Sequence, residues 1–368
     1  MNIVEFPGLW GLKIPVSRSP FSLFGIDIYW YGICIAVAFL VAVILALKDC
    51  SKYEIKQDDI LDLVLVIFPM GMIGARIYYV IFSWDEFKDN LINIINIRMG
   101  GLAIYGGIIA GVITAYVFAK VKKIKPLRLF DFGMPYVPLA QAIGRWGNFF
   151  NQEAFGINTD LPWGMTSEVI RSELSMNASR LARELNITVD PSKPVHPTFL
   201  YESLWDLGVF FILIWYRNKI KSDNNAQGKQ TKPDGEILWL YLILYGIGRA
   251  WIEGLRIDSL LAGGYRISQV LSIIFVIAAA IIMVIRRRRF NLIAEEGVYE
   301  LGTSNYGNIL REFQKIKNEE MHYDADEEVQ KGEAQNDQAE NNNEAPNDSE
   351  VSNSNETSKD ETGPENIS

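Results

Sequence analysis

Two short runs of polar residues lie inside otherwise apolar stretches of this chain and could together bind an anion. Arg145, Asn148 and Asn151 follow one another at intervals of three residues, and Glu253 follows Arg249 after four, so each run lies along one stripe of a helix. Guanidinium groups bind phosphate oxygens in pairs and keep their charge when partly removed from water. The pattern therefore favours the binding of a phosphate group in a water-poor site.

Further polar groups are expected at the same depth along the apolar stretches as the two runs. Arg256 extends the second stripe by three residues, and Arg76 lies in an apolar stretch of its own. Four more side chains lie at the ends of apolar stretches: Tyr29, Tyr31, Tyr105 and His196. The glycine pairs Gly100-Gly101 and Gly106-Gly107 leave the backbone accessible, so that a helix or a lipid can approach closely.

Each of these residues also has a purely structural interpretation. Arg249 and Glu253 could simply neutralise each other, and Arg76 could extend its charged end to the membrane surface. His196 could be only a polar residue at a boundary, and tyrosines are common interfacial anchors. Charges at membrane depth cost about 2.5–3.5 kcal/mol each and usually mark function. The convergence of several arginines and asparagines therefore favours a functional site.

Seven apolar stretches could position these residues as membrane-spanning helices, since a bilayer core of about 30 Å needs roughly 20 apolar residues. The predicted spans are 25–47, 60–82, 101–121, 133–148, 198–216, 236–255 and 267–285. The fourth is short and contains Pro135, Pro138 and Arg145. The sequence thus predicts an all-α polytopic membrane protein.

The basic residues predict the orientation, because cytoplasmic loops are enriched in Lys and Arg. Clusters follow the first, third, fifth and seventh spans, at 48–56, 120–128, 217–221 and 286–289. All four clusters lie on one side only if 133–148 crosses the membrane. The N-terminus is then outside and the C-terminus cytoplasmic, and the polar groups lie toward the outer leaflet.

The chain is predicted to divide into a seven-helix catalytic domain at 1–295, a cytoplasmic juxtamembrane segment at 296–320 and a tail at 321–368. The tail has fourteen acidic residues against two Lys, a net charge of −12 that leaves +3 from the total of −9 for the rest. Such a composition predicts disorder. The outer loop 149–197 could form a small subdomain or lid, with a helix near 167–185.

The sequence indicates no metal or organic cofactor. Cys34 and Cys50 are the only cysteines, and they offer neither metal-ligand spacing nor a disulfide framework. The N-terminus also lacks the basic segment, short apolar run and small-residue cleavage site of a removable signal peptide.

Four segments resemble the motifs of one family, the prolipoprotein diacylglyceryl transferases. The run 144–153, GRWGNFFNQE, is similar to the family signature G-R-x-G-N-F-x-N-x-E. Three others match in the family's order: GGLAIYGG at 100–107, HPTFLYE at 196–202 and YGIGRAWIE at 245–253. The resemblance covers about residues 20–290, and the first motif is highly specific.

The resemblance implies a seven-span enzyme of the bacterial plasma membrane with an outward-facing active site. The expected reaction moves the diacylglyceryl group of phosphatidylglycerol to the lipobox cysteine of a preprolipoprotein and releases glycerol-1-phosphate. No cofactor is implied. A transporter or flippase for anionic phospholipids is the alternative, but such proteins usually bind near the midplane between internal repeats, and the chain shows no repeat.

By the resemblance, important residues of the family are matched here by Arg145, Asn148, Arg249, Glu253, Tyr29 and Tyr245. The roles given next are expectations from the chemistry of the side chains. Arg145 and Arg249 are expected on the phosphate, Asn148 orients the headgroup and Glu253 positions Arg249. The expected lipid-binding residues also include Tyr29, Arg76, Gly101, Asn151 and Tyr245. Many family members have His where this chain has Tyr105, so either Tyr105 or His196 is expected to accept the thiol proton.

Overall fold

The computed structural model describes residues 2–295 apart from 24, 97–99, 260, 263 and 264, together with residues 312 and 316. The chain divides into two units, residues 1–310 and 311–368, and every element described below belongs to the first. The predictions made for 296–320 and for the acidic tail at 321–368 fall outside the described residues, apart from residues 312 and 316.

Within the described residues, each predicted span coincides with a helix. These are α1 (Trp30–Asp49), α2 (Gln57–Phe82), α3 (Ile104–Val121), α5 (Tyr136–Asn151), α7 (Thr198–Gln227), α8 (Glu236–Leu255) and α9 (Ile267–Glu295). Five of them, α1, α2, α3, α7 and α9, are long and apolar enough to cross a membrane. The other two are α5, with only 16 residues, and α8. These two carry the polar runs found in the sequence, which lowers their apolar character.

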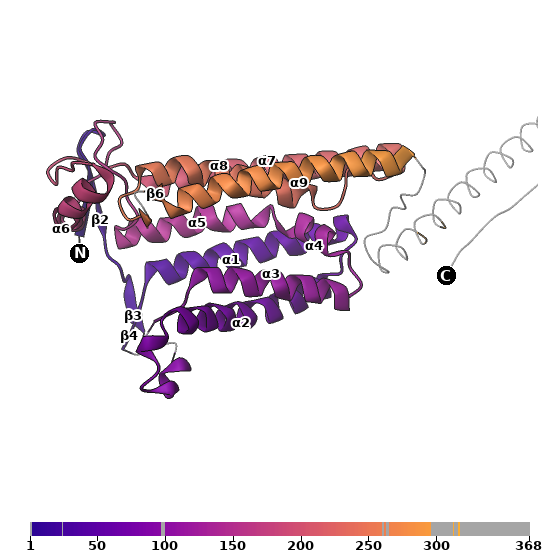
Figure 1. Cartoon of the computed structure of the whole chain (residues 1–368), viewed down its shortest axis with the longest axis horizontal. Coiled ribbons are helices and arrows are strands. Elements are labelled where there is room, and N and C mark those ends of the chain that lie inside the picture. Colours follow the sequence, from indigo (N-terminus) through magenta and orange to yellow (C-terminus); the bar gives the residue numbers. More distant parts are fainter. Residues whose placement is uncertain are drawn as a thin grey trace, which may run out of the picture. The chain divides into compact units, whose positions relative to one another are not determined.

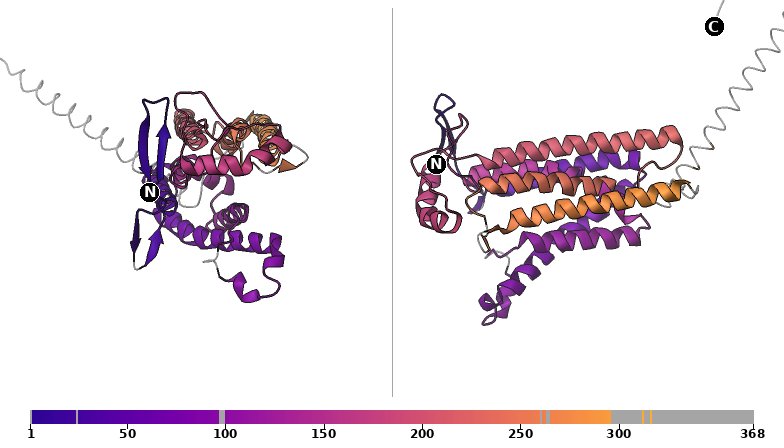
Figure 2. Two further views of the ribbon diagram at one scale, coloured as in Figure 1. Left: turned by 90° about the vertical axis from the view of Figure 1, so that its left-hand side faces the viewer. Right: turned by 45° about the horizontal axis from the view of Figure 1, so that its top comes forward.

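The seven helices lie side by side with their axes roughly aligned (Figure 1). α5 packs between α1 and α7, α7 packs on α8, and α8 on α9 (Figure 2). α2 and α3 form a close pair, because a Cβ atom on Gly106 would collide with the backbone of Gly74. This contact agrees with the expectation that the Gly106-Gly107 pair permits close approach of helices.

One end of the helix bundle carries a small layer of strands and a helix. β1 (Asn2–Phe6) pairs antiparallel with β2 (Leu12–Val16), and Glu5 bonds through its backbone to Thr166. α6 (Glu168–Leu185) is the helix expected near 167–185, and the Ser167 hydroxyl caps it by accepting the Ile170 N–H. The hairpin, α6 and the start of α7 share one apolar core, which includes Val4, Ile170, Leu174, Val195 and Phe199.

Short elements complete this end of the bundle. They are the hairpins β3 (Phe21–Leu23) with β4 (Ile26–Ile28) and β5 (Leu261–Ala262) with β6 (Tyr265–Arg266), and the single turns η2 (Trp84–Glu86) and η3 (Leu91–Ile94). The periodicity of the sequence did not predict these hairpins, because each strand has only two to five residues.

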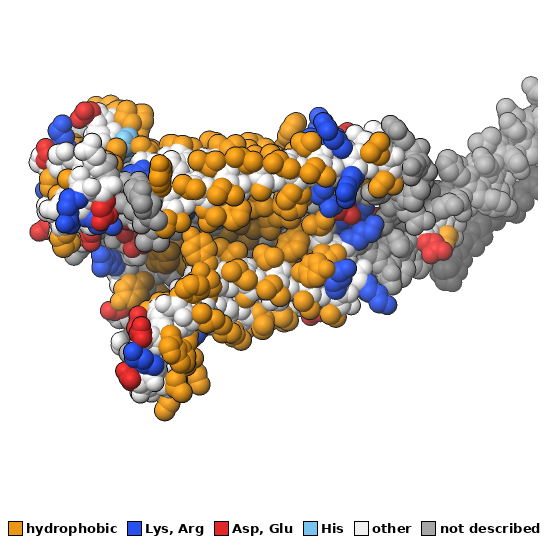
Figure 3. Space-filling model, in the orientation of Figure 1, with side chains coloured by type: hydrophobic (Ala, Val, Ile, Leu, Met, Phe, Trp, Pro, Cys, Tyr) orange, Lys and Arg blue, Asp and Glu red, His pale blue; other side chains and the backbone are white. Residues whose placement is uncertain are grey.

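The opposite end is rich in Lys and Arg (Figure 3). Here the turn η1 (Cys50–Tyr53) and the short helix α4 (Pro126–Gly133) join the long helices. Asp131 of α4 accepts the backbone N–H groups of Gly235, Ile237 and Leu238 and thus caps the start of α8. Arg217 of α7 donates to Asp49 of α1 at 2.8 Å. These contacts hold α1, α4, α7 and α8 together at the Lys/Arg-rich end of the bundle.

Candidate functional site

A buried glutamate joins the two arginine runs. Glu202 of α7 is 5% exposed and forms ion pairs with Arg145 of α5 and with Arg249 of α8, the latter at 3.1 Å. Arg256, at the end of α8, donates to the same carboxylate at 3.0 Å. Three arginines from two helices therefore converge on one carboxylate, and α7 supplies it because it packs between α5 and α8.

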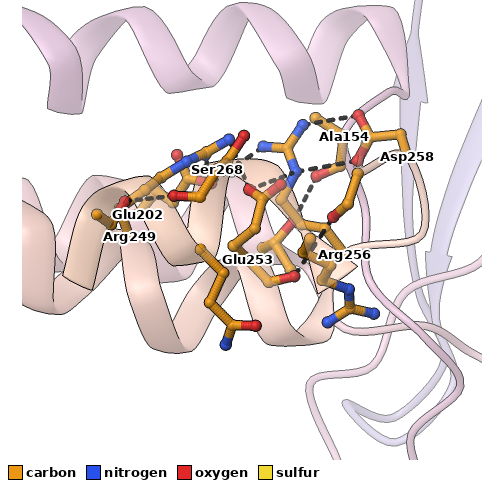
Figure 4. A network of polar contacts seen from close by, with 12 residues as sticks. Ala154, Glu202, Arg249, Glu253, Arg256, Asp258 and Ser268 are labelled. Atoms are coloured by element: carbon orange, nitrogen blue, oxygen red, sulfur yellow. Dashed lines mark hydrogen bonds and ion pairs between the residues drawn. The ribbon is translucent and has the colours of Figure 1, made fainter. Parts of the chain in front are cut away.

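A second layer of carboxylates orients the arginines of α8. Glu253, 1% exposed, pairs with Arg249 at 2.6 Å, one helical turn away. Arg256 donates to both oxygens of Asp258, at 2.9 and 2.7 Å. Figure 4 shows Glu202, Arg249, Glu253, Arg256 and Asp258 gathered at the end of α8. The expectation that Glu253 positions Arg249 agrees with this contact.

The charges of this arginine cluster, defined as Arg145, Arg249, Arg256 and their carboxylate partners, nearly cancel. Three guanidiniums face the carboxylates of Glu202, Glu253 and Asp258. Compensation is needed because an unpaired charge away from water is very costly. A phosphate that binds here must therefore either replace a carboxylate as the acceptor of an arginine N–H group or accept from arginine N–H groups that bond to no carboxylate.

Free donors do remain on the two arginines expected to bind phosphate. Among the described residues, Arg145 contacts only Glu202, through Nη2, so its Nε and Nη1 are unused. Arg249 uses Nη1 and Nη2 but not Nε. Their side chains are 23% and 19% exposed, against 10% for Arg256. Arg145 and Arg249 are thus the members of the cluster that can receive an oxyanion.

The two asparagines of the signature run are held by its last residue. Asn148 and Asn151 both donate their side-chain amides to Glu153, at 3.0 and 3.2 Å. The chain reverses at Gln152, which has a φ of 55°, and this turn brings Glu153 back to the end of α5. The spacing of the signature therefore builds an amide pair on the stripe of α5 that carries Arg145.

Arg76 lies apart from the arginine cluster. Its guanidinium donates to the backbone carbonyls of five residues in the loop that follows α2: Asn93, Ile94, Asn96, Gly100 and Gly101. Gly101 has a φ of 77°, and a Cβ there would meet the Arg76 guanidinium at 2.5 Å. All the donors of Arg76 are occupied, so the structure uses Arg76 and Gly101 to shape this loop.

The tyrosines occupy three different places. Tyr29 precedes α1 and is 54% exposed, and Tyr105 on α3 is 52% exposed with its ring against Tyr78. Tyr245 of α8 stacks on Tyr241 with ring centroids 5.6 Å apart. Tyr245 interacts electrostatically with Arg249 and with others of the cluster, so it is the tyrosine that the fold brings to the arginines.

His196 belongs to a hydrogen-bonded chain just before α7. The indole N–H of Trp163 donates to the Tyr201 hydroxyl at 2.8 Å, and this hydroxyl shares a hydrogen bond of 3.0 Å with Nδ1 of His196. Burial lowers the pKa of His196 below its ordinary value of 6.5. The imidazole is therefore neutral at pH 7 and able to accept a proton.

An apolar groove lies between α1 and the two helices that carry Arg145 and Glu202. It has a volume of about 360 Å³ and is lined by α1, α5 and α7. Trp146, next to Arg145, and Ser203, next to Glu202, both line it, and the Ser203 hydroxyl donates to the Ala142 carbonyl at 2.8 Å. The remaining lining residues are Trp30, Ile33, Cys34, Val37, Leu139, Ala142, Ile143, Phe150 and Leu207. A hydrocarbon chain could lie here.

Two acidic residues central to this region were missing from the residues predicted for the site. Glu202 is the common partner of the arginines, and Asp206, 4% exposed, lies one turn further along α7. A signal for both was present, because they are carboxylates four residues apart inside the apolar span 198–216. Charges at membrane depth mark function whether they are basic or acidic.

Comparison with known proteins identifies close relatives. A family model described as prolipoprotein diacylglyceryl transferase matches residues 18–285. A phosphatidylglycerol–prolipoprotein diacylglyceryl transferase of Clostridioides difficile is 43% identical over 282 residues, 76% of this chain and 100% of the relative. Enzymes of the same name from Finegoldia magna and Streptococcus suis are 45% and 42% identical, over 73% and 79% of this chain and 95% and 98% of their own lengths.

Proposed function

The chain belongs to the prolipoprotein diacylglyceryl transferase family, and from this premise we propose its reaction and its site. It transfers the diacylglyceryl group of phosphatidylglycerol to the lipobox cysteine thiol of preprolipoproteins and releases glycerol-1-phosphate. The observation that carries the proposal is the convergence of Arg145, Arg249 and Arg256 on Glu202. Membership of a transferase family favours this reaction over lipid transport.

We further propose that all seven helices span the bacterial plasma membrane, with the N-terminus outside and the C-terminus in the cytoplasm. The concentration of Lys and Arg at the end of the bundle opposite α6 supports this orientation (Figure 3). α5 and α8 can cross because α1, α7 and α9 cover their polar stripes. The arginine cluster then lies at the outer leaflet, where phospholipid headgroups are found.

In the proposed mechanism the free donors of Arg145 and Arg249 bind the lipid phosphate. The cysteine thiolate attacks the glycerol carbon that carries the phosphate, the C–S bond forms, and the C–O bond to the phosphate breaks. Negative charge grows on the departing phosphate, and preorganised donors in a dry site stabilise that charge most effectively. Asn148 and Asn151, held by Glu153, orient the headgroup. The acyl chains occupy the groove between α1, α5 and α7.

The direct test is transfer of labelled diacylglyceryl from phosphatidylglycerol to a lipobox peptide by the purified protein. We expect label on the Cys peptide, release of glycerol phosphate, and no label on a matched Ser peptide, because the thiolate is the nucleophile. Labelling of neither peptide by well-folded protein would reject the transferase and favour a phospholipid transporter.

The proton acceptor can be identified from the pH dependence of kcat. If His196 accepts the thiol proton, kcat should fall as the pH drops through its lowered pKa, because imidazolium cannot accept a second proton. His196→Asn would then remove both this acid limb and roughly 10²- to 10⁴-fold of the rate. If Tyr105 is the acceptor, Tyr105→Phe causes that loss and His196→Asn keeps the acid limb. Near-normal turnover in both variants would contradict both assignments.

Truncation after Asn305 should preserve activity. Every residue proposed for the site lies before residue 295, and the Clostridioides difficile relative is matched along 100% of its length by 282 residues of this chain. Transfer rates of the truncated and full-length proteins, compared in the same vesicles, should agree within about twofold. A loss of tenfold or more would make the C-terminal residues part of the enzyme.

A further inference from the structure

A buried carboxylate without a partner lies next to the arginine cluster. Asp206 of α7 is 4% exposed, and within the described part of the chain its carboxylate forms neither a hydrogen bond nor an ion pair. It interacts electrostatically with Arg145, Arg249 and Glu202. A buried polar group is normally hydrogen-bonded, so an unpartnered carboxylate at membrane depth indicates a ligand that supplies donors.

A second polar group that bonds to no described residue lies on the neighbouring helix α8. The Tyr245 hydroxyl makes no hydrogen bond to any described residue, and Tyr245 interacts electrostatically with Asp206 and with both phosphate-binding arginines. Its ring is fixed by stacking on Tyr241, whose own hydroxyl donates to Gln141 at 3.2 Å. Asp206 and Tyr245 thus provide an acceptor on α7 and a donor on the neighbouring α8, and neither bonds to a described residue.

The chemistry of these two groups suits a hydroxyl-bearing headgroup. A hydroxyl can donate to the Asp206 carboxylate and accept from Tyr245 without adding charge. A second anion would be repelled by the Asp206 carboxylate, because the charges of Arg145 and Arg249 are already compensated by Glu202 and Glu253. A neutral polyol linked to a phosphate satisfies the open groups and the arginines together.

We propose that Asp206 and Tyr245 bind the hydroxyl groups of the glycerol headgroup and so determine which phospholipid serves as donor. This inference rests on the proposed transferase function. It makes Asp206 a specificity-determining residue, and the thiol chemistry does not require it. A site built to bond a hydroxyl discriminates strongly against an analogue that lacks it, because the buried polar groups are then left unpaired.

The test compares two donors with identical acyl chains, phosphatidylglycerol and phosphatidyl-1-propanol, whose headgroup lacks the terminal hydroxyls. With the full-length protein and the lipobox Cys peptide, kcat/KM should favour phosphatidylglycerol by roughly 10²-fold or more. In Asp206→Ala this preference should fall to within about fivefold, mainly through loss on phosphatidylglycerol. Tyr245→Phe, which removes a single oxygen, should lower the preference in the same direction and provides the test if Asp206→Ala does not fold.

The control is Asp62→Asn. Asp62 is an exposed aspartate near the start of α2, where it pairs with Lys122, so this variant should keep the wild-type preference. Equal use of both lipids by the wild-type protein would overturn the inference. So would an unchanged preference in Tyr245→Phe and in a folded Asp206→Ala. Absence of transfer from either lipid by the wild-type protein would instead reject the transferase function itself.

Discussion

Transfer should fall by roughly 10²- to 10³-fold or more when either Arg145 or Arg249 is replaced by alanine, because each removes donors aimed at the charge that develops on the leaving phosphate. Both arginines retain unused N–H groups, whereas Arg256 is held by three carboxylates. The measurement is the initial rate of diacylglyceryl transfer to the lipobox peptide, with membrane insertion checked by protease protection.

Two further variants show whether charge or geometry is responsible. Arg145→Lys and Arg249→Lys keep the charge but lose the planar fork, so their rates should lie between those of the wild type and the alanine variants. Arg171→Ala, an exposed arginine of α6, should transfer normally and serves as the control. An inserted Arg145→Ala or Arg249→Ala protein with near-normal turnover would contradict the proposed phosphate contacts.

Glu202→Ala should lower both the thermal stability of the protein and its transfer rate. Of the variants proposed here, it should have the largest effect on stability. It leaves three guanidiniums, of which Arg256 is buried and Arg145 and Arg249 are partly buried, without their common acceptor, and breaking a buried ion pair costs about 3–5 kcal/mol. These ion pairs join α5 to α7 and α7 to α8. Thermal unfolding in detergent should therefore shift to lower temperature, and the transfer rate should fall because Arg145 and Arg249 are no longer held in position.

Glu202→Gln separates the two effects. It keeps the size of the side chain and one acceptor oxygen, so it should recover part of the stability while transfer stays well below that of the wild type. Glu184→Ala on the exposed face of α6 is the matched control for loss of an acidic side chain. A Glu202→Ala protein with wild-type unfolding temperature and wild-type transfer would refute its central place in the arginine cluster.

The compensation of charge changes how the site is expected to work. The sequence predicted a carboxylate partner for Arg249 in Glu253, and the fold adds Glu202 and Asp258 as partners of the arginines. An apo site with three uncompensated guanidiniums would be unstable at membrane depth. Binding of the lipid phosphate therefore resembles an exchange of partners, in which Arg145 and Arg249 keep some contacts to carboxylates and offer their remaining donors to the phosphate.

The sequence alone determined the helices and the family, and it predicted most of the polar residues proposed for the site. Apolar stretches of span length predict helices because the bilayer excludes unsatisfied backbone groups, and each predicted stretch coincides with a helix among the described residues. The signature run 144–153 identified the family, which the comparisons confirm. Such features are local, so hydropathy and motif spacing are sufficient to find them.

Only the tertiary structure decided which charges meet. Glu202 lies 57 residues from Arg145 and 47 from Arg249, and it joins them because α7 packs between α5 and α8 with this face turned inward. In contrast, Arg76 lies on α2, where its donors are consumed by the carbonyls of a loop. Hydropathy places a residue at a depth in the membrane, but helix rotation and packing set its partners. For that reason the arginines and Glu253 could be predicted from the sequence, whereas their convergence on Glu202 could not.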